Sequence, residues 1–273
     1  RLGAATGEDA LSPGKGRLVA SREEALKRAD LRTLASAEDA AEAERLAERL
    51  GAALRYRLSR RRLPARRGTA IDLRRSLRRN VSKGGEPLEL LRKRRPERPV
   101  KLVLLLDVSG SMQLYSRFLL HFVRGLLGHF LTAEAFVFHT RLVPISDALR
   151  ERDRLRAMDR LSLMAEGFGG GTRIAGALER FNGRYAKETL NARSVVVILS
   201  DGYDTDPPER LAAELIRLKR RTRRLIWLNP LLGWRDYAPV ARAMAAALPF
   251  IDCFAAAHSL ASLAAIEPEL ARL

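Results

Sequence analysis

The second half of the chain alternates short apolar runs with longer amphipathic segments. Uninterrupted apolar runs occupy 102–106 and 195–199, and runs of this length are typical of strands buried on both faces of a parallel sheet. Further strands are expected at 133–138, 225–228 and 250–256. Because helical patterns separate these runs, the sequence predicts an α/β fold with a mostly parallel central sheet and helices on both faces.

The helices expected between the strands show apolar residues at three- and four-residue spacing. The helix after the first strand carries Leu114, Phe118, Phe122 and Leu126 on the face that should press on the sheet. A later helix is expected to begin directly after Asp206, which would act as its N-cap with Pro207 at its first position. The other helices are expected at 151–164, 174–185, 239–247 and from Ser259 onward, with a short edge strand at 142–146.

Positive charge is concentrated ahead of the α/β pattern. Segment 55–98 holds 17 Lys or Arg residues and four acidic residues, in a chain whose net charge is +18. We therefore expect two parts, a basic, mainly helical region at 1–98 and an α/β domain at 99–273. A segment this basic favours an anionic partner, which could be nucleic acid, a membrane surface or an acidic protein face.

Two helices are expected within the basic region. Leucines recur every fourth residue from Leu46 to Leu58, in a helix capped by Ser36. Thr69, with Asp72 three residues later, is expected to cap a short basic helix. That helix should run to about Arg79, with a strand following at 88–93.

Cysteine usage and hydropathy indicate the compartment. The single cysteine, Cys253, cannot form an internal disulfide, which suits a reducing environment. The longest stretch without a formal charge is 253–266, with 14 residues, whereas a membrane-spanning helix needs about 20 apolar residues. These features favour a reducing compartment and predict no membrane-spanning helix.

Polar residues with metal-binding chemistry lie where strands are expected to meet helices. Asp107, Ser109 and Ser111 form the pattern Asp-x-Ser-x-Ser directly after the first buried run. Thr172 follows a run of glycines, and Asp201 follows the second buried run. These connections converge, because parallel strands end at one edge of a sheet. Carboxylates and hydroxyls are the hard oxygen donors that Mg²⁺ and Mn²⁺ prefer, so the sequence predicts a metal site at this edge.

This arrangement resembles the metal-ion-dependent adhesion site (MIDAS) of von Willebrand factor A (VWA) domains, whose fold is Rossmann-like. The resemblance implies that Ser109, Ser111 and Thr172 bind the ion through their hydroxyls. It implies that Asp107 and Asp201 hold the ion directly or through water. The expected ion is Mg²⁺, with Mn²⁺ or Ca²⁺ as alternatives, and an acidic residue of a partner would fill the open coordination position.

Three further segments resemble the CoxE-like branch of bacterial VWA proteins. They are IDLRRSLRR at 71–79, GGEPLELLRKRRPERPVKLVLLLDVSGSM at 84–112 and WLNP at 227–230. The resemblance implies a non-enzymatic cytoplasmic adaptor that works with a MoxR-type AAA+ ATPase. Such pairs mature or activate a client metalloenzyme, here a carbon monoxide dehydrogenase-like client. The candidate partner-binding residues are Arg74, Arg75, Arg78 and Arg79.

Parts of the sequence are also compatible with two other functions. A nucleic-acid-binding protein could use segment 55–98, but its only aromatic residue is Tyr56, which leaves little to stack on bases. A metal-chelatase subunit would be expected to carry an ATPase module or an acidic linker. The glycine run lacks the Lys-Ser/Thr of a phosphate-binding loop, and neither Ser109 nor Ser111 lies in a GxSxG elbow. Hydrolase chemistry is therefore not predicted.

Overall fold

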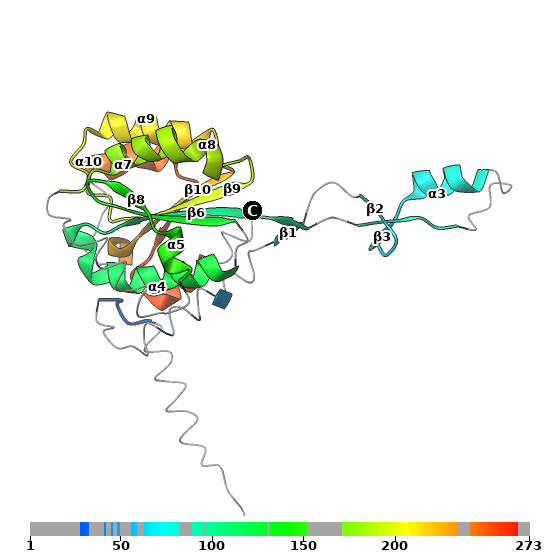
Figure 1. The fold of residues 1–273 in the computed structure, drawn as a ribbon, viewed down its shortest axis with the longest axis horizontal. Helices are drawn as coiled ribbons and strands as arrows, with labels where there is room; N and C mark the ends of the chain where they lie inside the picture. The colour runs from blue at the N-terminus through cyan, green and yellow to red at the C-terminus, as the bar shows by residue number, and fades with distance from the viewer. Residues whose placement is uncertain are drawn as a thin grey trace, which may run out of the picture.

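One six-stranded sheet organises the computed structural model (Figure 1). Its strand order is β11-β10-β9-β6-β7-β8, and every pairing is parallel except that of β7 with the edge strand β8. The strands are β6 (Lys101–Asp107), β7 (Ala133–Phe138), β8 (Leu142–Pro144), β9 (Ser194–Leu199), β10 (Arg224–Asn229) and β11 (Cys253–Ala256). The structure describes residues 28–32, 41, 45, 48–49, 56–58, 63–81, 89–94, 97–129, 132–151, 171–233 and 241–266.

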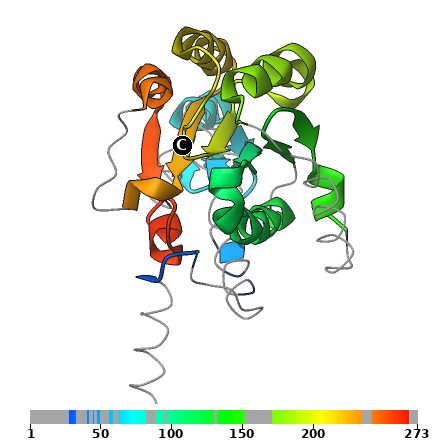
Figure 2. The same cartoon turned by 90° about the vertical axis from the view of Figure 1, so that its left-hand side faces the viewer.

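Helices cover both faces of this sheet, as predicted (Figure 2). The helices on one face are α4 (Gln113–His129), α5 (Ser146–Leu149) and α11 (Leu260–Ala264). Those on the other face are α7 (Ile174–Arg180), which continues through a π-helical turn (Phe181–Tyr185) into α8 (Ala186–Thr189), α9 (Pro208–Lys219) and α10 (Arg242–Ala247). Short 3₁₀ turns lie at Gly110–Met112, Pro230–Gly233 and Leu248–Phe250. The helix expected at 151–164 falls outside the described residues.

The central strand β6 is buried because both of its faces are apolar. Leu102, Leu104 and Leu106 belong to the core under α4, whereas Val103 and Leu105 belong to the core under α7 and α9. This division follows from the two-residue alternation of side chains along a strand. The packing of both faces holds the carboxyl end of β6, and with it Asp107, between two layers of helices.

Helix α4 packs on the sheet through the predicted face, with one exception. Phe118, Phe122 and Leu126 are buried as expected, but Leu114 is 65% exposed. Leu114 lies in the first turn of α4, immediately after the Gly110–Met112 turn. That turn of the helix adjoins the loop at the end of β6 rather than the strands, so the expectation of a buried Leu114 was wrong.

The basic region contains strands as well as a helix. We call residues 63–81 and 89–94 the arm; its elements are β2 (Leu63–Ala65), β3 (Ala70–Ile71), α3 (Leu73–Asn80) and β4 (Arg92–Arg94). The three strands form an antiparallel sheet of order β2-β4-β3. Among the described residues the region is therefore not mainly helical. The strand predicted at 88–93 is only partly right, because β4 contains Arg92 and Lys93 whereas residues 89–91 precede the strand.

A two-stranded ladder connects the arm to the domain. β1 (Tyr56–Leu58) pairs antiparallel with β5 (Glu97–Pro99), and β5 leads directly into β6. Leu58 therefore lies in a strand, not in the helix that the leucine spacing predicted. Local periodicity could not indicate this pairing, because the two strands are far apart in the sequence. The rest of that leucine series lies outside the described residues.

Helix α3 confirms the predicted basic helix but corrects its cap. Asp72, not Thr69, is the N-cap residue, and its carboxylate accepts a hydrogen bond from the backbone N–H of Arg75 at 3.3 Å. Thr69 lies one residue before β3, and pairing of that strand with β4 takes the chain past it in extended form. In the part of the chain described, no helix has the length and apolarity to cross a membrane.

Candidate metal centre

Four of the five predicted metal ligands meet at the carboxyl edge of the sheet, where β6 and β9 end side by side. Asp107 Oδ1 accepts the backbone N–H of Ser109 at 2.9 Å, and the hydroxyls of Ser109 and Ser111 lie 3.2 Å apart. Asp107 Oδ2 accepts the Ser200 hydroxyl at 2.6 Å. This contact joins the end of β6 to the segment after β9, and the Ser111 hydroxyl lies near enough to Asp201 to lower the pKa of that carboxylate. The site is therefore preformed by hydrogen bonds between two neighbouring loops.

Thr172 joins this group through its backbone. Its carbonyl accepts hydrogen bonds from the N–H and the hydroxyl of Thr205, at 2.9 and 2.8 Å, and so binds it to the loop of Asp201. The next residue, Arg173, donates its N–H to the carbonyl of His139 at the end of β7. Thr172 is 5% exposed. All three predicted loops thus meet at one edge of the sheet. We call the segments of Asp107–Ser111, Thr172 and Asp201 the metal loops.

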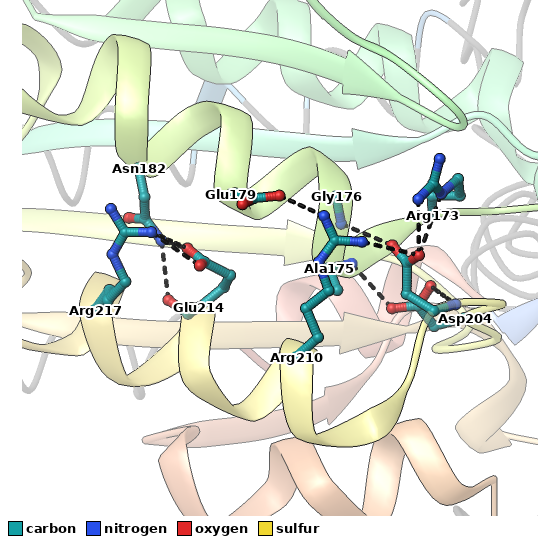
Figure 3. Close-up of polar contacts among 10 residues, drawn as sticks. Arg173, Ala175, Gly176, Glu179, Asn182, Asp204, Arg210, Glu214 and Arg217 are labelled. Carbon is teal, nitrogen blue, oxygen red and sulfur yellow. Dashed lines mark hydrogen bonds and ion pairs between the residues drawn. The ribbon is translucent and has the colours of Figure 1, made fainter.

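Two aspartates hold the start of α7, which begins two residues after Thr172 (Figure 3). Asp204 accepts the N–H groups of Ile174 and Ala175 at 3.0 and 2.9 Å. Asp206 accepts the N–H of Gly176 at 3.0 Å. The predicted role of Asp206 was therefore wrong, since α9 begins at Pro208 without a side-chain cap. Asp206 instead caps a helix about 30 residues earlier in the sequence, a contact that local sequence could not show.

Arginines surround Asp206 on the outer side. Arg173 Nη2 lies 3.1 Å from Asp206 Oδ1, and Arg210 Nη1 lies 3.2 Å from the same oxygen. Arg210 also pairs with Glu179 of α7, and Figure 3 shows it reaching across from α9. These contacts join α7 to α9 beside the Thr172 loop. Because these ion pairs are partly exposed, we expect them to orient α7 relative to α9 more than to stabilise the fold.

Three residues that the sequence did not mark as functional position Asp107 and Asp201. Ser200 donates its hydroxyl to Asp107 Oδ2. Trp227 donates its indole N–H to the Ser200 carbonyl at 2.9 Å, and Asn229 donates its amide to the Asp201 carbonyl at 2.9 Å. The WLNP segment therefore holds the loop that carries Asp201. Its likeness to the family was visible in the sequence, but its contact with this loop was not.

Glycine is required at one position of that loop. Gly202 has a φ of +84°, in the left-handed region that other residues avoid. A β-carbon at this position would also collide with the side chain of Met244. Gly202 thus allows the chain to turn sharply after Asp201 while α10 packs against it.

Burial of two carboxylates makes the centre electrostatically unfavourable without a cation. Asp107 is 0% and Asp201 1% exposed. Burial raises the pKa of Asp107 to about 7, opposed by the hydrogen bond from Ser200 and reinforced by the negative charge of Asp201. Burial also raises the pKa of Asp201, opposed by its hydrogen bond with Ser111. A divalent cation between these groups would relieve both the repulsion and the cost of desolvation.

The donor set fits a hard divalent cation. Within the described residues, His, Cys, Asp and Glu side chains form no cluster of three or more that could hold a metal ion. The two carboxylates therefore need hydroxyl oxygens to complete a coordination sphere, and Ser109 and Ser111 lie beside them. Six oxygen ligands are usual for Mg²⁺, so residues and water would share the sphere.

A family comparison agrees with the geometry of this edge. The family model described as "VWA domain containing CoxE-like protein" matches residues 43–263. The chain belongs to this family. The sheet of this CoxE-like VWA protein is the Rossmann-like sheet of the VWA fold. The family membership predicted from the three sequence segments is therefore confirmed.

Solved structures similar to this CoxE-like protein share little sequence with it. An aerotolerance-related membrane protein from Bacteroides fragilis is 15% identical, with a TM-score of 0.43. The match covers 64% of this chain and 100% of that protein's chain. A von Willebrand factor type A protein from Catenulispora acidiphila is 16% identical, with a TM-score of 0.44, covering 64% of this chain and 43% of its own. A mussel byssus protein, proximal thread matrix protein 1, described with a zinc-occupied MIDAS motif, is 15% identical, with a TM-score of 0.41 and coverages of 63% and 47%.

This chain spans less than half of the latter two proteins. No curated protein matches it significantly.

The cap on α7 gives a first testable expectation for this CoxE-like VWA domain. We expect Asp204→Ala to lower the free energy of unfolding by about 1–2 kcal/mol, because the N–H groups of Ile174 and Ala175 lose their acceptor. Since Thr172 lies only two residues before this helix, affinity for Mg²⁺ should fall as well. Calorimetric titration with Mg²⁺ and denaturant unfolding measure the two effects.

Asn182→Ala is the matched control. Asn182 joins the same helical segment to α9 through Glu214, at 2.8 Å, but at the end away from Thr172 (Figure 3). It should lower stability without changing Mg²⁺ affinity. An equal loss of affinity in both variants would show that the cap does not act through Thr172.

Proposed function

We propose that this CoxE-like VWA protein is a non-enzymatic adaptor that uses a bound Mg²⁺, or Mn²⁺ or Ca²⁺, to capture a carboxylate of a partner protein. The proposal rests above all on the two buried carboxylates that approach one another beside serine hydroxyls at the sheet edge. When bound, the ion supplies a Lewis-acidic position open to one further oxygen. The proposed ligands are Asp107, Ser109, Ser111, Thr172 and Asp201.

The chain's own residues would divide this task. Asp107 and Asp201 supply the negative charge, and Ser109 and Ser111 supply neutral oxygens that leave the ion strongly electrophilic. Ser200 orients Asp107 through its 2.6 Å hydrogen bond. Trp227 and Asn229 hold the backbone that carries Asp201. Such an arrangement recognises an anionic oxygen and requires no proton transfer, which suits an adaptor.

Membership of the CoxE-like family supports the choice of partners. We propose that the protein works in the cytoplasm with a MoxR-type AAA+ ATPase in the maturation or activation of a metalloenzyme, with a carbon monoxide dehydrogenase-like client. VWA domain proteins are typically non-catalytic adaptors, which supports the same role. We further propose that residues 1–98 and 99–273 form two functional units.

The position of the arm supports a bridging role. The arm joins the domain through β5 at the amino end of β6, whereas Asp107 lies at the carboxyl end of that strand. Figure 1 shows α3 projecting beyond the sheet. Surfaces at opposite ends of one strand can contact different partners without competing for space.

The test is Mg²⁺-dependent retention of the partner on the full chain. Tagged protein would be mixed with the ATPase and the client enzyme from the same cells, in Mg²⁺ and in chelator. We expect at least about tenfold less retention in chelator and with Asp107→Ala, since a single coordination contact carries the recognition. Glu188→Ala is the control, because Glu188 is an exposed acid of α8 away from the metal loops.

Retention that ignores Mg²⁺ and Asp107→Ala would contradict the proposal. If it also disappeared with nuclease or moderate salt, the basic segment would act on phosphates instead, as a nucleic-acid-binding protein would.

A further inference from the structure

Helix α3 has its polar side buried and its apolar side exposed. Ser76 and Asn80 are 1% and 0% exposed, whereas Leu73, Leu77 and Val81 are 66%, 54% and 70% exposed. A helix that belongs to a self-contained unit normally shows the reverse pattern. The apolar side of α3 is therefore presented outward.

Hydrogen bonds fix this orientation. Leu91 donates its N–H to the Ser76 hydroxyl at 2.8 Å. The Asn80 side chain donates to the Glu89 carbonyl at 2.9 Å and accepts the Glu89 N–H at 3.0 Å. Because buried polar groups are costly to separate from their partners, the helix cannot rotate to hide its leucines without breaking these bonds.

Helix geometry divides the four arginines into two rows. At 100° per residue, Leu73, Leu77 and Val81 form one row about 12 Å long. Arg74 and Arg78 lie beside this row, on the side away from Ser76 and Asn80. The other two, Arg75 and Arg79, lie beyond the buried polar side, on its far flank from the leucine row. There Arg79 Nε lies 3.4 Å from Glu89 Oε2. All four are exposed.

Exposed apolar side chains gather in the arm. The large hydrophobic residues exposed among the described residues are Leu63, Ile71, Leu73, Leu77, Val81, Leu90, Leu114 and Tyr203. Six of these eight belong to the arm, and the other two flank the metal loops. Single exposed leucines are ordinary, but three exposed aliphatic residues in line along α3 and its C-cap indicate an interaction surface.

We propose that the row Leu73–Leu77–Val81, with Arg74 and Arg78 beside it, docks an acidic amphipathic helix of a partner protein. Apolar residues spaced every fourth position fit the anchors of a helix laid alongside. Carboxylates on that helix would pair with Arg74 and Arg78, since α3 itself carries no acidic residue. The proposal deepens the adaptor function by naming the partner chemistry of the arm, and it does not depend on the metal centre.

A protein helix suits this surface better than a lipid bilayer. The row has only three aliphatic side chains and no aromatic one, whereas helices that lie in a membrane interface are commonly longer and carry Trp, Phe or Leu along their whole apolar face. The fixed attachment to the Glu89–Leu91 segment also restricts how deeply α3 could enter lipid. Vesicle binding is therefore a distinct outcome of the test.

The test uses a fluorescein-labelled 18-residue peptide with Leu at every third or fourth position and Glu elsewhere, beside a matched peptide with Lys in place of Glu. Anisotropy would be measured with the full chain in chelator, so that failure of the metal centre cannot affect the result. We expect micromolar binding of the Glu peptide only. Leu73→Ser/Leu77→Ser and Arg74→Gln/Arg78→Gln should each weaken it about tenfold or more.

Two control variants carry the same types of substitution at other exposed positions. Arg66→Gln/Arg67→Gln removes the same charge from the turn between β2 and β3 of the arm, where both arginines are exposed. Leu114→Ser removes an equally exposed leucine from the domain. Each should change affinity by less than about twofold. Circular dichroism would confirm that the variants keep their helix content.

Equal losses from the two arginine pairs would overturn the proposal, because they would indicate general charge attraction. Binding that is unaffected by Leu73→Ser/Leu77→Ser would also overturn it. So would leucine-dependent binding to vesicles of phosphatidylserine and phosphatidylcholine without peptide binding. Leucine-dependent self-association in sedimentation would instead identify a second copy of this chain as the occupant.

Discussion

Asp107→Asn is expected to stabilise the metal-free protein while abolishing its response to Mg²⁺. The pKa of Asp107 is raised to about 7 by burial and by the charge of Asp201, whereas an unfolded Asp has a pKa of about 3.9. Ionisation therefore favours the unfolded chain. For the metal-free wild type, the free energy of unfolding should fall as pH rises from about 4 to about 7, by up to about 4 kcal/mol.

An amide at position 107 removes this dependence. The asparagine carries no charge, and the Ser200 hydroxyl can donate to or accept from its side chain. At pH 8 in chelator the variant should be more stable than wild type by a few kcal/mol, whereas near pH 4 the advantage should vanish. Saturating Mg²⁺ at about 100 times its Kd should add about 2.7 kcal/mol to wild type and nothing to the variant.

Denaturant unfolding from pH 4 to 8, with Mg²⁺ and with chelator, measures these effects. Glu188→Gln is the control, because it also replaces an acid by an amide but at an exposed position. A variant that is less stable than wild type at pH 8 in chelator would show that Asp107 is not held at an electrostatic cost.

Trp227→Phe is expected to weaken both the fold and the metal centre. Trp227 is 0% exposed, and its indole N–H is bonded to the Ser200 carbonyl. Phenylalanine leaves that carbonyl without its donor and leaves part of the indole volume empty. Together these changes should lower the free energy of unfolding by about 2–4 kcal/mol. Because Ser200 and Asp201 would then be less well placed, Mg²⁺ affinity should fall several-fold.

Phe181→Leu separates the two effects. Phe181 belongs to the same core and is also 0% exposed, but it lies beyond the end of α7, away from the metal loops. It should reduce stability by about 1–2 kcal/mol and leave Mg²⁺ affinity unchanged. If the two variants lost affinity equally, the effect of Trp227 would reflect stability alone. Mg²⁺ titration calorimetry and denaturant unfolding give both quantities.

The sequence predicted those features that depend on local pattern. The strand at Ala133–Phe138 was placed without error, and β9 and β10 to within a residue at each end, because buried strands require continuous apolar runs. The loops of Asp107 and Asp201 were located by the same runs. Their meeting at one edge followed from the parallel sheet.

Features that depend on distant pairing were missed. Asp204 and Asp206 cap a helix about 30 residues earlier, and β1 pairs with a strand about 40 residues later. Ser200 could have been suspected from its place between a buried strand and Asp201. The contacts of Trp227 and Asn229 could not, because they depend on which strand lies next to β9.

The continuity of β5 with β6 sets a distance. β6 is hydrogen-bonded on both sides and buried between two cores, so it cannot bend or stretch appreciably. From Lys101 to Asp107 it spans about 20 Å. In the proposed bridging role, a partner held at β5 and a partner bound at Asp107 are therefore kept at a separation that the length of β6 dictates. Lengthening β6 would change that spacing only by shifting the register of the sheet.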